Sequence, residues 1–171
     1  MSELDIFNSD KVDQIVTNTL NGCDDGELYV EDNLSENFNF DDNVLKSTSY
    51  NESKGFGLRA VNEDLIGYAH SSNLDIKALQ EASSTVSSVK NGHSGEKVID
   101  PVKTNNKLYS DKNPLNNIAF SKKVKLLENI NEYSRSLDKR VSQLAVNLSG
   151  SWQKINIFRP SGQKLYDIRP L

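Results

Sequence analysis

The sequence predicts an α+β fold, with a mostly antiparallel sheet flanked by helices and followed by a second helix-plus-sheet unit that is incomplete at its C-terminus. The connections Asp41-Asp42-Asn43 and Asn62-Glu63-Asp64 are too short to hold crossover helices, so the strands they join must run antiparallel. Apolar residues recur at helical spacing on both sides of these strands. The predicted division is an N-terminal α+β domain at residues 1–90, a linker at 91–114 and a truncated second unit at 115–171.

A short amphipathic helix is the first predicted element. Its apolar positions are Val12, Ile15, Val16 and Leu20. Ser9-Asp10 is a cap signal before this helix, and Gly22 stands where a left-handed residue commonly follows a helix. Strand signals follow at residues 27–32, 35–40 and 45–50, and then at 54–61 and 65–69, which together are typical of a hairpin.

A second helical pattern runs from Leu74 to Val89. Asp75 is its expected N-cap, and Leu74 and Leu79 have the spacing of a hydrophobic staple. The polar, Gly- and Pro-containing linker comes next, with one extended stretch expected around residues 98–102.

The second half predicts one helix and then strands. Ser121 is expected to cap a helix from Lys122 to about Leu137, with apolar positions at Val124, Leu127, Ile130 and Leu137. Lys122, Lys123 and Lys125 oppose the dipole of this helix and are interpreted as a solvated surface turn. Strand-like runs return at residues 140–150 and 152–170, with Ser149-Gly150 and Pro160-Ser161-Gly162 as turns.

The chain stops inside an extended segment, which indicates that it is part of a longer protein. The runs SWQKINIF and KLYDI are therefore expected to present an unpaired sheet edge to another chain.

Composition favours a soluble protein of the cytoplasm. The formal charge of −4 and the lack of a basic block argue against direct binding of nucleic acid. No apolar run approaches the roughly 20 residues of a membrane helix, so no membrane partner is expected. The acidic N-terminus MSELDIFNSD lacks the positive region of a secretory signal peptide.

The glycine pair in Gly55-Phe56-Gly57 invites comparison with a phosphate-binding loop. A dinucleotide fingerprint needs a third glycine where this chain has Ala60, and a helix where this chain predicts a hairpin. Because Gly55 and Gly57 share one face of a strand, we interpret them as positions where a helix or an aromatic ring comes close to the backbone.

No catalytic, cofactor-binding or metal-binding residue is predicted in this chain. Cys23, His70 and His93 are its only thiol and imidazole groups, and they lie in three separate contexts. His93-Ser94 is rejected as a base and nucleophile because adjacent residues rarely align for proton transfer. Asp24-Asp25 and Asp41-Asp42 are interpreted as turn residues, because they lack the regular alternation of a calcium loop.

Eight runs spread over the chain carry a family resemblance: LYVED, LKSTSY, GFGLRAV, GYAHS, LYSDKNPL, LDKRV, LSGSW and DIRPL. Their order and spacing resemble the N-terminal third or so of the TldD/PmbA family, metallopeptidases also described as modulators of DNA gyrase. The LDKRV and DIRPL runs resemble the TldD branch more than the PmbA (TldE) branch. The hairpin turn Asn62-Glu63-Asp64 and the linker around His93 depart from the family pattern.

The resemblance implies a zinc peptidase whose His-Glu-x-x-x-His helix and downstream cysteine lie in a C-terminal part absent from these 171 residues. No cofactor is therefore expected in this chain, and zinc is expected in the full-length family member.

Two functions remain open. In the first, the chain is the non-catalytic N-terminal portion of a TldD-type peptidase. It then helps to form a dimer with a PmbA-type paralogue or a second copy and to confine peptides. In the second, the chain is a stand-alone module that pairs with partner strands through an exposed sheet edge.

Overall fold

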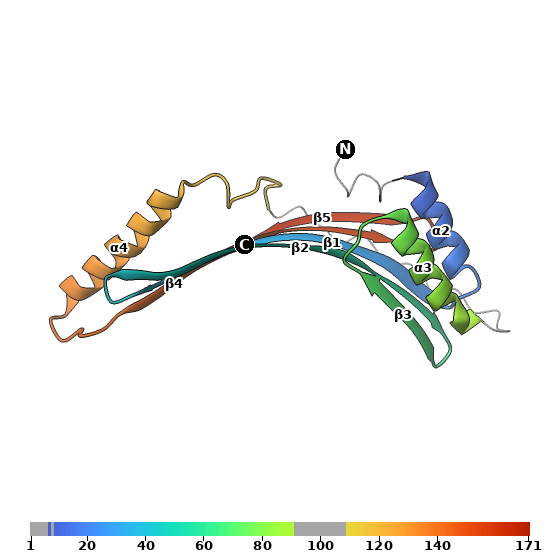
Figure 1. The fold of residues 1–171 in the computed structure, drawn as a ribbon, viewed down its shortest axis with the longest axis horizontal. Coiled ribbons are helices and arrows are strands. Elements are labelled where there is room, and N and C mark those ends of the chain that lie inside the picture. Colours follow the sequence, from blue (N-terminus) through green and yellow to red (C-terminus); the bar gives the residue numbers. More distant parts are fainter. Residues whose placement is uncertain (1–6, 8, 91–108) are drawn as a thin grey trace. The chain divides into compact units, whose positions relative to one another are not determined.

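The computed structural model of the chain describes residues 7, 9–90 and 109–171 (Figure 1). In chain order its elements are α2 (Asp10–Leu20), β1 (Asp25–Asp41), β2 (Val44–Asn62), β3 (Leu65–Ser71), α3 (Ile76–Val86), the 3-10 turn η1 (Ser87–Lys90), α4 (Phe120–Leu137), β4 (Ala145–Phe158) and β5 (Lys164–Pro170). The strands form one five-stranded antiparallel sheet in the order β3-β2-β1-β4-β5. The predicted α+β class with an antiparallel sheet is confirmed. The predicted stretch around 98–102 and His93 lie outside the described residues.

The described residues group into two compact units, each assembled from segments that are not consecutive. The first unit holds residues 7, 9–32, 53–90 and 154–167, and the second holds 33–52, 109–153 and 168–171. The long strands contribute residues to both units. Strands β4 and β5, expected to start a separate sheet, instead continue the sheet of β1 to β3.

The predicted strands are shorter than the observed ones. The runs at 27–32 and 35–40 are parts of the single strand β1, and the runs at 45–50 and 54–61 are parts of β2. The residues between these runs, 33–34 and 51–53, form no turn, because they lie inside the continuous strands β1 and β2. The predicted turn at Ser149-Gly150 is wrong, because both residues lie inside β4.

Left-handed residues mark the two hairpin turns predicted between β1, β2 and β3. Asp42 and Asn43 have φ of 49° and 69°, the mirror-image turn that matches strand twist and favours Asn and Asp. Glu63, with φ of 52°, is held by its backbone N–H, which donates to the Asp24 carboxylate at 2.6 Å. Both predicted turns are confirmed.

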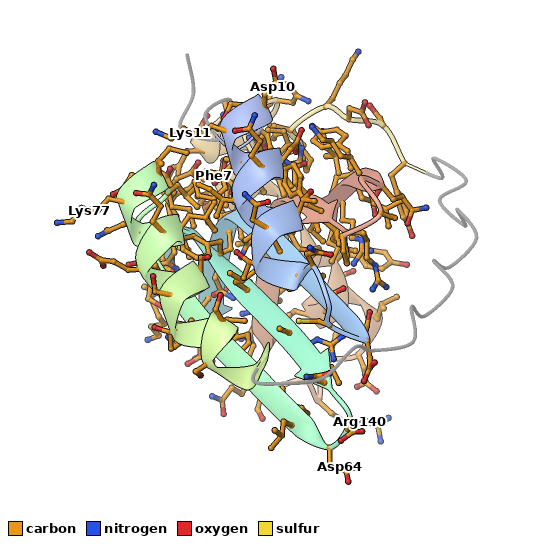
Figure 2. All side chains as sticks on the ribbon, turned by 90° about the vertical axis from the view of Figure 1, so that its right-hand side faces the viewer. Phe7, Asp10, Lys11, Asp64, Lys77 and Arg140 are labelled. Carbon is orange, nitrogen blue, oxygen red and sulfur yellow. The ribbon has the colours of Figure 1, made fainter. Side chains whose placement is uncertain are left out.

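In the first unit, α2 and α3 lie side by side over one face of the sheet (Figure 2). Phe7 lies beside α2 on the side of α3, and its ring centroid is 5.6 Å from that of Phe56 on β2. The fully buried side chains of this core include Val12, Val16, Leu20, Leu28, Val30, Leu58, Leu79 and Val86. Burial of such side chains contributes roughly 1.5 to 3 kcal/mol each to stability.

The ends of α2 and α3 follow the sequence signals. The side chain of Asp75 accepts a hydrogen bond from the backbone N–H of Ala78 at 2.8 Å, which confirms it as an N-cap. Gly22 has φ of 85° after α2, as predicted. Leu74 and Leu79 are both buried, in agreement with the expected staple.

In the second unit, a buried ion pair joins α4 to β1. The Lys123 ammonium donates to both oxygens of the Glu36 carboxylate, at 2.6 and 2.7 Å, and to the Leu115 carbonyl oxygen at 2.7 Å. The Lys123 and Glu36 side chains are only 8% and 13% exposed. The interpretation of Lys123 as part of a solvated turn is therefore wrong. Its ammonium replaces water by three oxygen acceptors and also lies over the Phe38 ring.

Arg135 of α4 holds the tip of the β1–β2 hairpin. Its guanidinium pairs with Asp42 and also donates to the Asn131 side chain at 3.1 Å. Asn131 in turn donates to the Asn43 side chain at 2.5 Å. These contacts explain how a turn of two left-handed residues keeps one arrangement against the helix.

Helix α4 begins earlier than predicted, and an exposed ion pair follows its last residue. Its N-cap is Ala119 rather than Ser121, because Phe120 belongs to the helix and its ring packs on Phe38 with centroids 5.4 Å apart. After α4, hydrogen bonds from the Arg140 side chain and backbone hold the pKa of the Asp138 carboxyl below its ordinary value. The Asp138–Arg140 pair therefore stabilises the fold at pH values above the ordinary Asp pKa. This stabilisation is lost as the pH falls through the lowered pKa of Asp138.

Strand β5 is an edge of the sheet and β4 is not. The KLYDI run lies in β5, whereas SWQKINIF lies in β4 between β1 and β5. The expectation that SWQKINIF forms an open edge is therefore wrong.

Within the ranges that the structure describes, no helix has both the length and the apolar character needed to span a membrane.

Gly26 should be intolerant of a side chain. A Cβ built there would lie 2.6 Å from Leu20 Cδ2 and 2.7 Å from the Arg59 carbonyl oxygen, and a backbone atom of a paired strand cannot move away cheaply. We expect Gly26→Ala to lower the free energy of unfolding by about 1 to 3 kcal/mol in urea titrations. Gly57→Ala is the matched control, because its nearest neighbour is the exposed Tyr68 ring, which can rotate. Equal losses in the two variants would contradict this explanation.

The Lys123–Glu36 pair allows a second stability test. Lys123→Met leaves a buried carboxylate without its cation and should cost about 3 to 5 kcal/mol of unfolding free energy. Lys123→Met/Glu36→Leu removes both charges and should recover at least half of that loss. Lys122→Met, on an exposed position of the same helix, should stay within about 0.5 kcal/mol of the parent chain. A loss below about 1 kcal/mol for Lys123→Met would show that the pair does not hold the helix.

Candidate functional site

The candidate site is a groove on the face of the first unit's sheet that α2 and α3 do not cover, here called the open face. Because side chains alternate along a strand, Tyr29 and Glu31 of β1 point away from the helix-covered Leu28 and Val30. The groove has a volume of about 340 Å³. Its lining residues are Tyr29, Glu31, Ser53, Lys54, Gly55, Phe56, Gly57, Tyr68, His70, Ser71 and Ser72.

Two glycines form the floor of the groove. In the pairing of β2 with β3, Gly57 lies opposite His70 and Arg59 lies opposite Tyr68. A Cβ on Gly57 would lie 2.8 Å from the Tyr68 hydroxyl oxygen, and one on Gly55 would lie 2.7 Å from the Ser71 carbonyl oxygen. The missing side chains therefore let the Tyr68 ring and the end of β3 approach β2, as the sequence predicted. The residues around Gly55 and Gly57 belong to a strand of a hairpin and not to a phosphate-binding turn.

Aromatic rings and one carboxylate give the groove its chemistry. The rings of Tyr68 and His70 stack with centroids 5.8 Å apart and planes 29° apart. The Tyr29 hydroxyl donates to one Glu31 oxygen at 2.6 Å, which orients the carboxylate in the groove. Stacked rings beside an acceptor and a glycine floor can hold an extended peptide segment by ring contacts and hydrogen bonds.

The structure brings together only some of the residues that the sequence singled out. Gly55, Gly57 and His70 share the groove. Cys23 lies apart in the helix-covered core, 5% exposed, with its thiol directed at the Thr19 carbonyl oxygen at 4.0 Å. Sequence reasoning missed Tyr29 and Tyr68. Strand alternation alone could have placed Tyr68 on the same face as His70.

A cluster of ion pairs lies elsewhere in the first unit. Asp25 pairs with Arg59 at 2.8 Å and with Arg159 at 2.7 Å, and Glu27 lies 3.7 Å from Arg59. The interpretation of Asp25 as a turn residue is therefore wrong, because Asp25 begins β1 and its charge is matched by cations on both sides. Asp24 does lie in the turn and accepts from Glu63.

The described residues do not fit the zinc site that the family resemblance implies. Among residues 7, 9–90 and 109–171, no three His, Cys, Asp or Glu side chains converge to hold a metal ion. His70 stacks on Tyr68 at the groove, while the Cys23 thiol is enclosed in the core. A zinc site needs three or four such ligands around one ion.

Comparison with known proteins assigns a family to the region that contains the groove. Residues 26–90 match the family described as PmbA/TldA metallopeptidase domain 1. This region belongs to the TldD/PmbA family. The family resemblance predicted from the sequence is thereby confirmed, and it covers β1 to η1, including every residue that lines the groove.

Relatives of the TldD/PmbA family extend the likeness over most of the chain. The chain is 29% identical over 155 residues to the metalloprotease TldD homolog of Haemophilus influenzae, and the match covers 86% of this chain and 31% of that protein. The chain spans about a third of the length of the curated relatives it matches.

Solved structures share the fold. A crystal structure of a proposed modulator of DNA gyrase from Bacteroides thetaiotaomicron has a TM-score of 0.68 at 12% identity, with 95% of this chain and 39% of that chain covered. The structure of TldE from Thermococcus kodakarensis has a TM-score of 0.67 at 14% identity, with 99% of this chain and 37% of that chain covered.

Proposed function

We propose that this chain is the non-catalytic N-terminal portion of a TldD-type zinc metallopeptidase, acting in dimer assembly and substrate confinement in the cytoplasm. The observation that carries the proposal is the match of residues 26–90 to domain 1 of the metallopeptidase family. The third of the relatives' length that the chain covers supports a role as one part of a larger enzyme. Its partner would be a PmbA (TldE)-type paralogue or a second copy of the chain.

The dispersed thiol and imidazole groups support a non-catalytic role. Cys23 and His70 lie in different surroundings, and a peptidase needs its zinc ligands and a carboxylate base around one water molecule. Zinc would therefore come from the remaining part of the full-length protein. We further propose that residues 115–171 begin the family's central domain, although their strands belong to the same sheet as β1 to β3.

The groove supports a role in confining peptides. An extended peptide laid across the glycine floor would meet the Tyr68 and His70 rings and the Glu31 carboxylate. Such contacts hold a substrate segment without chemical reaction and leave cleavage to groups elsewhere.

The alternative function is that of a stand-alone module that binds partner strands. It is favoured by the two edge strands β3 and β5, each of which has a sheet neighbour on one side only. Lys164, Arg169 and Pro170 on β5 are residue types that weaken pairing at an exposed edge. We therefore rank this function second.

The proposed function predicts that the isolated chain binds no stoichiometric zinc and cleaves no peptide. When residues 1–171 replace the matching segment of the Haemophilus influenzae relative, the chimera should regain both properties. Metal analysis and a fluorogenic peptide assay, each with and without added zinc, test the two proteins. Peptidase activity of the isolated chain that survives repurification and disappears in His70→Ala would contradict the proposal.

The groove predicts binding of an unstructured peptide of about ten residues, the length of a strand. Added to the isotopically labelled chain, the peptide should shift the amide resonances of Gly55, Gly57 and His70. Tyr68→Ala should weaken this binding roughly tenfold, because it removes the ring over the floor. Tyr166→Ala, at a similarly exposed tyrosine on β5, should leave it unchanged. Equal weakening by both variants would exclude the groove as the binding site.

A further inference from the structure

The groove on the open face contains a carboxylate that a neighbouring side chain orients. Glu31 is the only acid among the described residues that line the groove, and its Oε2 atom accepts a hydrogen bond of 2.6 Å from the Tyr29 hydroxyl. Glu31 is half-buried, and a carboxylate has lone pairs beyond the one that this hydrogen bond uses. The groove therefore presents a negative charge that can accept further hydrogen bonds from a ligand.

Aromatic side chains reach the groove from both neighbours of β2. The sheet order β3-β2-β1 places β2 between Tyr68 and Glu31. A Cβ on Gly57 would lie 2.8 Å from the Tyr68 hydroxyl oxygen, so the Tyr68 ring extends over β2 toward β1. His70 stacks on that ring, and Tyr29 lines the groove from β1. The carboxylate and the rings thus surround a floor that lacks side chains.

A carboxylate beside aromatic faces suits a cationic ligand. A guanidinium or ammonium group is attracted to the face of a tyrosine ring and forms a charge-assisted hydrogen bond with a carboxylate. The guanidinium is planar, so it can stack on Tyr68 while its N–H groups donate to Glu31. An acidic side chain would instead meet the Glu31 charge, and this repulsion disfavours acidic peptides.

The positive charges near the groove do not cancel this preference. Lys54 also lines the groove but is exposed, and its flexible stem lets the ammonium turn toward water. Arg59, opposite Tyr68 in the pairing of β2 with β3, lies 2.8 Å from the Asp25 carboxylate and 3.7 Å from that of Glu27. Its charge is therefore matched by two carboxylates of β1.

We propose that the groove recognises a basic side chain, arginine or lysine, in the peptide that it confines. Glu31 and the Tyr68 ring are the two contacts of that side chain, and the peptide backbone lies over the glycine floor. Tyr29 is a positioning residue, because its hydroxyl orients Glu31. The proposal rests on the proposed function of confining peptides and specifies the class of peptide.

Unstructured peptides of about ten residues that differ only in a central arginine, lysine, norleucine or glutamate test the proposal. Norleucine is the matched control, because it keeps an unbranched stem and lacks the charge. Each peptide is titrated into the isotopically labelled chain, and the amide shifts of Gly55, Gly57 and His70 give its affinity at the groove. The arginine and lysine peptides should bind roughly tenfold more tightly than the norleucine peptide, and the glutamate peptide should bind more weakly than it.

Two isosteric variants separate recognition by Glu31 from general attraction of a cation to a chain of formal charge −4. Glu31→Gln keeps an acceptor for the Tyr29 hydroxyl but should remove most of the preference for arginine over norleucine. Glu81→Gln removes the same charge from α3, where the Glu81 side chain is 69% exposed, and should keep the preference. Tyr29→Phe should reduce the preference roughly threefold and leave the norleucine affinity unchanged.

Four results overturn the proposal. Equal affinity of the arginine and norleucine peptides at the groove does so and leaves the peptide-confining function intact, whereas no shift with any peptide overturns both. Equal loss of preference in Glu31→Gln and Glu81→Gln would assign it to net charge. The same titrations on the zinc-free chimera give the fourth result. A preference that is present in the isolated chain and absent from the chimera would show that the rest of the enzyme covers the groove.

Discussion

Antiparallel pairing of the long strand β1 with β2 on one side and β4 on the other is the constraint on which the rest of the structure depends. Because side chains alternate along a strand, this pairing decides which residues of each unit meet a helix and which face away. Leu28, Val30 and Leu58 form the helix-covered core of the first unit, and the residues between them line the open face. The groove is thus a direct consequence of strand pairing.

The two units hold their helices by different interactions. In the first unit, α2 and α3 cover a large apolar core, and the Thr19 and Ser83 hydroxyls form a hydrogen bond of 2.6 Å between the two helices. In the second unit the core cluster is small, with Phe38, Phe40 and Leu127 as its buried members. The Lys123–Glu36 pair and the Arg135 contacts add directional bonds that keep α4 in one orientation there. Large apolar side chains of α4, such as Leu126 and Tyr133, remain exposed.

The match of residues 26–90 to domain 1 of the TldD/PmbA family connects the groove to the proposed function. In the proposed arrangement, the groove on the open face would hold a peptide while zinc chemistry takes place in another part of the enzyme. The groove lies on a surface that the helices of the first unit leave uncovered, so this role requires no change in the core.

Local signals in the sequence determined the α+β class, the hairpin turns, the cap at Asp75 and the close approach at Gly57, because each depends on residues near in the chain. Its motif order also predicted the resemblance to the TldD/PmbA family, which the match of residues 26–90 confirms. Only the tertiary structure decided that β4 joins β1, that Asp25 pairs with Arg59 and Arg159, and that Lys123 is buried against Glu36. The paired positions of each of these contacts are between 34 and 134 residues apart. Helical or strand periodicity carries no information over such separations, since it reports which face of an element is apolar and not which element will cover it.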